Sequence, residues 1–209
     1  RMDDKTPSAY EEPWGLTASP SVINGIAGDN LWAYDSPSFS GLTLHATYQS
    51  KEQTSSTSAY SDMGFTFAPE MVEGLTIGYA AGTVDESTSQ DTTADITGID
   101  ESTMWGTYAY GSLTVGYQTS SADGSTSTQD DDSTSWGVSY AVSDELSISY
   151  GEHNMDLGSS TTDQESEGFS ASYTMGGATI SASFNETNNV GGTATTDVDN
   201  YEVAVSFAF

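Results

Sequence analysis

The clearest alternation of apolar and polar positions lies at the end of the chain, from Tyr201 to Phe209. Successive side chains of a β-strand point to opposite faces, so one face of this segment is apolar and the other carries Glu202 with small residues. The apolar face comprises Tyr201, Val203, Val205, Phe207 and Phe209. An apolar face toward lipid, a small polar face toward water and a terminal aromatic residue predict the closing strand of a bacterial outer-membrane β-barrel.

The same period of two recurs along the chain and predicts an all-β protein with eleven visible strands. The predicted strands span residues 30–35, 42–49, 62–68, 75–81, 104–110, 113–118, 136–141, 146–150, 169–174, 178–184 and 201–209. Leu75, Ile77 and Tyr79, for example, share one face of the fourth strand. The orientation of the fifth strand stays open, because Trp105 and Tyr108 fall on opposite faces.

The connections between these strands alternate between two lengths. Tight turns are expected at residues 69–74, 110–112, 142–145 and 175–177, and long Ser/Thr/Asp tracts at 50–61, 82–102, 119–135, 151–168 and 185–200. Short turns at one rim and long loops at the other are typical of antiparallel outer-membrane barrels, with the short turns in the periplasm. A soluble sandwich would seldom alternate so regularly, and its apolar faces would pack against each other. The pairs Trp105-Gly106 and Trp136-Gly137 also suggest one repeated hairpin unit.

The direction of the strands predicts that the N-terminus is truncated. Barrels of this class have an even number of strands and both termini in the periplasm. Counting back from the last strand, the segment 30–35 also runs toward the periplasm. An odd number of eleven therefore predicts at least one further strand upstream of Arg1.

Composition narrows the class further. The chain has 31 Asp and Glu against 3 Lys and Arg, for a formal net charge of -28, which argues against nucleic acid or an anionic membrane surface as a partner. No run approaches the roughly 18 apolar residues of a membrane helix. Such acidity is compatible with disorder, but the periodic aromatic residues argue for strands. Cysteine is absent, which excludes a disulfide framework and a thiolate metal site. No apolar leader precedes the strands, so we interpret the chain as a mature or truncated product.

Residues 30–42, which read NLWAYDSPSFSGL, resemble the hairpin motif Asn-x-x-Arg-Tyr-x-Ser-Pro-x-Phe-x-Gly-Phe of Gram-negative general diffusion porins. The acidic chain with Ser/Thr loops is most similar to porins of marine alphaproteobacteria. The resemblance implies a transmembrane barrel of sixteen strands that forms trimers, of which this chain holds the last eleven. Residues 1–209 would be a single porin domain, with residues 1–29 as the constriction loop and residues 30–209 as membrane strands and acidic extracellular loops.

One residue departs from the motif. The fourth motif position, Arg in the family, is Ala33 here. In porins the acidic constriction loop faces a basic wall, so either this wall lies in a segment that precedes the chain, or the pore lacks a strong transverse field.

Two groups of residues are candidates for the pore. Acidic residues of the candidate constriction loop would attract cations and repel anions, unless they are only solvated loop residues; these are Asp3, Asp4, Glu11 and Glu12. The side chains expected to face the lumen are Ala33, Asp35, Thr43, His45, Thr47, Gln49 and Glu202. His45 either lines the constriction or is a solvated lumen histidine, and its titration would make conductance mildly pH-sensitive.

Other motifs offer little chemistry. The acidic runs 85–86 and 130–132 contain ligands that Ca²⁺ favours, but they lack EF-hand spacing, and we interpret them as a solvated acidic rim. No nucleophile elbow, zinc-protease motif or P-loop occurs. His153 beside Glu152 is the remaining pair of a kind that barrel hydrolases use at the rim. We therefore expect no enzyme activity, no metal and no cofactor.

The predicted function is passive diffusion of small hydrophilic solutes and ions through the bacterial outer membrane, with a preference for cations. The expected partners are these solutes, membrane lipid, two further copies in a homotrimer, and the barrel-assembly machinery, which would recognise the terminal strand. An alternative is a non-conducting surface or adhesion barrel, although the small Gly, Ser, Thr and Ala side chains of the lumen face favour a pore. A more remote alternative is a secreted acidic β-sandwich.

Overall fold

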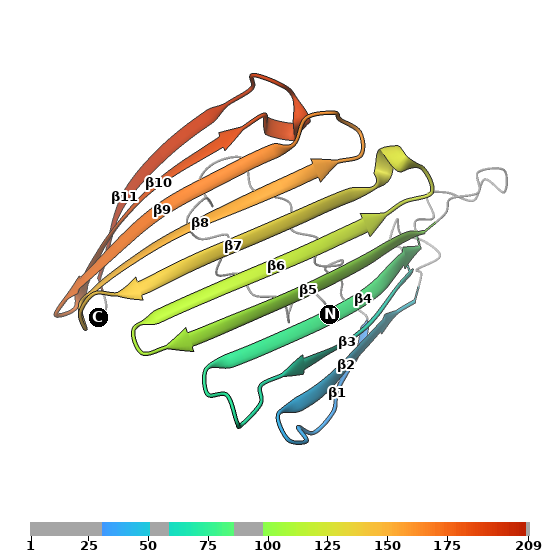
Figure 1. The fold of residues 1–209 in the computed structure, drawn as a ribbon, viewed down its shortest axis with the longest axis horizontal. Coiled ribbons are helices and arrows are strands. Elements are labelled where there is room, and N and C mark those ends of the chain that lie inside the picture. The colour runs from blue at the N-terminus through green and yellow to red at the C-terminus, as the bar shows by residue number, and fades with distance from the viewer. Residues whose placement is uncertain (1–30, 51–58, 86–97, 208–209) are drawn as a thin grey trace.

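The computed structural model describes residues 31–50, 59–85 and 98–207. Its eleven strands form one antiparallel sheet in which each strand pairs with its neighbours in sequence, and the sheet curls as a single layer (Figure 1). The strands are β1 (Leu31–Asp35), β2 (Leu42–Gln49), β3 (Ala59–Phe67), β4 (Leu75–Asp85), β5 (Ile99–Tyr110), β6 (Leu113–Asp123), β7 (Asp131–Ala141), β8 (Leu146–Leu157), β9 (Gln164–Met175), β10 (Ala178–Asn188) and β11 (Val198–Phe207). Two short 3-10 helices, η2 (Ser127–Gln129) and η3 (Val190–Gly192), lie in the connections. Among the described residues no helix is long and apolar enough to cross a membrane.

All eleven predicted strands are present in the predicted order, but most are longer at the end next to the long connections. β8 continues to Leu157, seven residues beyond the predicted end, and β5 begins at Ile99 rather than at residue 104. The tract 151–168 is therefore strand at both ends, and only residues 158–163 connect β8 to β9. The backbone ladder needs no apolar side chains, so it continues past the point where hydrophobic alternation stops.

The convex face of the sheet carries the apolar side chains. Tyr150 pairs with Phe169, Phe169 with Phe184, and Phe184 with Tyr201, so an aromatic row crosses β8 to β11. Large apolar side chains on this face are exposed over the whole sheet, among them Leu44, Met63, Ile77, Met104, Val115, Tyr117, Ile180, Val203 and Val205. A continuous exposed apolar face with aromatic residues at its margins is the surface that a membrane barrel presents to lipid.

An acidic row follows directly on the aromatic row, toward the long connections. Glu152, Glu167, Glu186 and Asp199 are successive cross-strand neighbours on β8 to β11. The hydroxyl of Tyr150 lies 2.7 Å from Glu152 Oε1 and 2.5 Å from Glu167 Oε2. Like charges directly opposite one another are destabilising unless water screens them. The acidic row therefore marks where the apolar band ends and water begins.

The hairpin that carries the porin-like motif is closed by a two-residue turn. Phe39 and Leu42 exchange both backbone hydrogen bonds, with N···O distances of 2.8 and 3.0 Å. Between them Ser40 (φ 50) and Gly41 (φ 85) both have left-handed backbone conformations, as a type I′ turn requires. A Cβ atom on Gly41 would lie 2.0 Å from the carbonyl oxygen of Ala68, so the next turn leaves no room for a side chain.

Gly41→Ala is expected to lower the free energy of unfolding by about 2 kcal/mol or more, because the new methyl group adds a backbone clash to an unfavourable φ. Urea unfolding of the micelle-bound full-length protein, followed by tryptophan fluorescence, measures the change. Gly111→Ala is the matched control, because Gly111 has φ 59 but no atom within 4 Å of the added Cβ. This variant should lose about 1 kcal/mol of the free energy of unfolding, from the unfavourable φ alone. Equal losses in the two variants would contradict the contact with Ala68.

Candidate functional site

The concave face of the sheet is the candidate site, because it collects the small and polar side chains. Strand alternation places them there once the apolar side chains face outward. The buried polar residues of the described ranges all lie on this face; they are Thr47, Gln49, Asp62, Thr103, Gln118, Ser120, Ser133, Ser135, His153, Gln164, Ser166, Asn185 and Thr187. The site is therefore a hydroxyl- and amide-rich surface rather than a compact cluster of reactive groups.

Serine side chains line the part of this face nearest the short turns. Ser139, Ser149, Ser170 and Ser183 form one cross-strand row that ends at Glu202 on β11. The Oγ atoms of Ser149 and Ser170 lie 2.6 Å apart. Glu202 and its serine neighbours line a hollow of about 290 Å³. This wall offers small hydrogen-bonding groups and one carboxylate to whatever fills the concavity.

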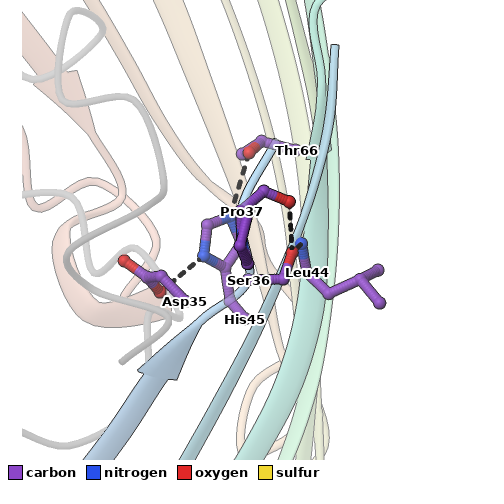
Figure 2. A network of polar contacts seen from close by, with 6 residues as sticks. All are labelled: Asp35, Ser36, Pro37, Leu44, His45 and Thr66. Carbon is purple, nitrogen blue, oxygen red and sulfur yellow. Dashed lines mark hydrogen bonds and ion pairs between the residues drawn. The ribbon is translucent and has the colours of Figure 1, made fainter. Parts of the chain in front are cut away.

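Asp35, His45 and Thr66 form a polar network across β1, β2 and β3 (Figure 2). His45 Nδ1 lies 2.8 Å from Asp35 Oδ1, and His45 Nε2 lies 2.9 Å from Thr66 Oγ1. Asp35 and His45 are direct cross-strand partners on the inner side of the sheet, whereas the neighbouring Leu44 points outward. A neutral ring can donate to Asp35 and accept from the Thr66 hydroxyl, and a charged ring can donate to both. The network therefore satisfies both ring nitrogens of His45 and links three strands on the inner side of the sheet.

The structure places the predicted lumen residues on one face and the predicted lipid-facing residues on the other. The concave face holds Ala33, Asp35, Thr43, His45, Thr47, Gln49 and Glu202, and the convex face holds Tyr201, Val203, Val205 and Phe207. Their roles in conduction and barrel assembly stay predictions. The remaining candidates, Asp3, Asp4, Glu11, Glu12 and Phe209, lie outside the described residues.

Strand alternation separates two sets of neighbouring residues that could have carried chemistry. His153 faces the concave side and is 2 % exposed, whereas Glu152 lies on the convex side, so the two cannot act together as a catalytic pair. Asp131 and Asp132 likewise alternate between the faces of β7. Asp131 Oδ1 accepts a hydrogen bond from the backbone N–H of Gly158, at 3.1 Å, which joins the start of β7 to the connection between β8 and β9. Among the described residues no group of three or more acidic, histidine or cysteine side chains could hold a metal ion.

Trp105 is a concave-face residue that the sequence left unassigned. It is 8 % exposed and covers Gly78, where an added Cβ would lie 2.4 Å from the indole ring. Trp136 lies on the convex face, where its Nε1 donates to Glu152 Oε2 at 3.1 Å. The two Trp-Gly pairs are therefore not one repeated unit. The orientation of Trp105 follows from the tight turn, because Tyr110 pairs with Leu113, whose face is known.

Comparisons with known proteins agree with this two-faced sheet. The model of the Gram-negative porin family matches residues 2–167. The chain belongs to the Gram-negative porin family. Porins are channels of the Gram-negative outer membrane, so the predicted location and the non-enzymatic class are confirmed. No curated protein sequence gave a significant match.

Solved porins share the fold at low sequence identity. The anion-selective porin from Comamonas acidovorans superimposes with a TM-score of 0.69 at 15% identity, covering 87% of this chain and 60% of that porin. In-vitro folded OmpT of Vibrio cholerae superimposes with a TM-score of 0.64 at 16% identity, and the match covers 99% of this chain and 72% of the OmpT chain. A mutant of the Rh. blastica porin superimposes with a TM-score of 0.52 at 13% identity, and the match covers 86% of this chain and 79% of that porin. The chain thus spans 60% of the length of the Comamonas porin.

Single-tryptophan variants of the full-length protein in liposomes test the two faces. A variant that retains Trp136, with the other tryptophans changed to Phe, is expected to lose the greater part of its emission to lipids brominated near the headgroup. A variant that retains Trp105 should lose little, because its indole lies on the other side of the backbone sheet. Strong quenching of Trp105 by the brominated lipid would contradict its inward orientation.

Proposed function

We propose that the protein is a general diffusion porin that passes small hydrophilic solutes and ions through the outer membrane and prefers cations. The observation that carries the proposal is the concave face, whose small hydroxyl and glycine positions leave room for water. Its charged side chains in the described ranges are carboxylates, namely Asp35, Asp62, Glu101, Asp131 and Glu202, with no Lys or Arg. Carboxylates along an aqueous passage raise the local concentration of cations. The selectivity of the Comamonas porin does not argue against this, because 15% identity conveys the fold and not the charges.

The proposal includes a constriction by residues 1–29, with Asp3, Asp4, Glu11 and Glu12 at the passage. Support comes from where this segment joins the sheet. Leu31 pairs with Gln49 at the end of β2 that leads into the long connections, so the segment meets the barrel at that rim. Its length then allows it to enter the concavity.

Closure and assembly complete the proposal. Within the described residues β1 and β11 each pair on one side only, and unpaired backbone groups are not tolerated in lipid. A conducting pore therefore needs both edges paired. Strands upstream of Arg1, in a sixteen-stranded barrel of the alphaproteobacterial type, stay a prediction. A trimer form of OmpT among the similar structures supports a homotrimer, with the convex face in lipid and the terminal strand as the assembly signal.

Planar-bilayer recording of the full-length protein is expected to show open, cation-preferring channels. Glu202→Gln should lower the cation-to-anion permeability ratio by up to about twofold, because water and salt screen a single lumen charge. Glu186→Gln is the matched control, since it removes a carboxylate from the neighbouring strand on the convex face. A closed barrel would support the alternative of a non-conducting surface protein. An anion-selective channel would contradict the proposed preference.

A further inference from the structure

The convex face is hollowed where the aromatic row gives way to the acidic row. A hollow of about 450 Å³, here called the outer hollow, extends across β7 to β10 and is lined by Trp136, Glu152, Glu165 and Glu167, among others. Trp136 pairs with Glu152 and Glu152 with Glu167, and Glu165 precedes Glu167 by two residues on β9, so all four share the convex face. The alternate side chains of β8 and β9 point to the concave side, so backbone forms the floor of the hollow.

The carboxylates of the outer hollow have no basic partner in the described part of the chain. Glu152, Glu165 and Glu167 are all exposed, and the described ranges contain no Lys or Arg. Like charges on neighbouring strand positions repel one another. The outer hollow is therefore electrostatically complementary to a cation.

Tyr150 increases this need for positive charge. Its hydroxyl oxygen lies 2.7 Å from Glu152 Oε1 and 2.5 Å from Glu167 Oε2. A tyrosine hydroxyl has one proton to donate, so one of these two contacts brings a hydroxyl oxygen against a carboxylate oxygen with no proton between them. A cation between the two carboxylates would offset this repulsion.

The aromatic lining favours an organic ammonium group over a metal ion. Trp136 is 40% exposed, its ring centroid lies 5.6 Å from that of Tyr150, and its Nε1 donates to Glu152 Oε2 at 3.1 Å. An aromatic ring beside carboxylates attracts weakly hydrated organic cations. Among the described residues, by contrast, no three acidic, histidine or cysteine side chains are grouped so that they could hold a metal ion.

The neighbours of the outer hollow indicate that its occupant is amphipathic. Phe169 follows Glu167 by two residues on the convex face and belongs to the aromatic row that borders the apolar band. The side chain of Phe169 is 47% exposed. A molecule with its amine between the carboxylates can therefore place an apolar part directly on this row, which a small water-soluble amine cannot do.

We propose that the outer hollow binds the protonated amine of a lipid headgroup, and that the acyl chains of this lipid lie along the apolar band. The amine donates to the carboxylates of Glu152, Glu165 and Glu167 beside the ring of Trp136. The inference depends on the outer-membrane location of the convex face and not on conduction, so it holds or fails independently of the proposed diffusion function.

The first test varies the lipid and leaves the protein unmodified. Full-length protein in detergent micelles is titrated with phosphatidylethanolamine, and native mass spectrometry counts the lipid molecules that remain bound. N-acetylphosphatidylethanolamine with the same acyl chains lacks the protonated amine and is expected to bind about fivefold more weakly. Equal binding of the two lipids would overturn the inference.

The second test removes charge from the outer hollow. Combined Glu165→Gln and Glu167→Gln substitutions are expected to weaken phosphatidylethanolamine binding about fivefold. Combined Asp100→Asn and Asp123→Asn substitutions are the matched control, because these directly opposed carboxylates of β5 and β6 lie on the convex face outside the hollow. The four side chains are exposed, so both variants should fold; the control should bind the lipid as the unmodified protein does.

Three further results would overturn the inference. Equal weakening in the two variants would mean that the overall negative charge attracts the lipid. Binding that disappears with EDTA would mean that a divalent cation bridges the carboxylates to the lipid phosphate. Displacement of the lipid by an equal concentration of spermidine would mean that the hollow takes soluble amines.

Discussion

The rest of the structure depends on the antiparallel hydrogen-bond ladder that joins each strand to the next. Backbone groups cannot go unpaired in lipid, so the ladder must be continuous from β1 to β11. Once register is fixed, side-chain alternation turns apolar side chains toward lipid on one face of the sheet and polar side chains toward water on the other. A slip of one residue would turn Leu44 toward water and His45 toward lipid. The ladder therefore sets fold and function together.

Register also explains where the membrane ends. Alternation alone says that Tyr150 and Glu152 share a face, but pairing aligns four aromatic residues and then four acidic ones across β8 to β11. An aromatic row tolerates the interface, whereas an acidic row needs water to screen its mutual repulsion. The strands continue beyond this boundary because the ladder persists in water. The apolar band is thus shorter than the strands that carry it.

The sequence predicts the part of the fold that lies in the apolar band, because only there does alternation of hydrophobicity produce a signal. β2 has its predicted bounds, whereas β8 extends seven residues beyond its predicted end. The added residues form a polar tract in which the two faces do not differ in hydrophobicity. Trp105 was ambiguous because an inward aromatic residue breaks the pattern locally. The cross-strand row of Ser139, Ser149, Ser170 and Ser183 could not be found at all. Its members lie in four strands at irregular spacings, and only register brings them side by side.

The concave surface is chemically asymmetric, and this asymmetry bears on selectivity more than the fold does. The wall of β6 to β9 offers mostly bare backbone, hydroxyls and amides, with Asp131 near the long connections. The other carboxylates of this face, Asp35, Asp62, Glu101 and Glu202, stand on β1, β3, β5 and β11. The anion-selective porin from Comamonas acidovorans has a similar curved sheet at 15% identity, so the fold alone does not predict the proposed cation preference. Under the proposed function, the inward side chains must then set the selectivity, because they are the groups that differ between barrels of the same curvature.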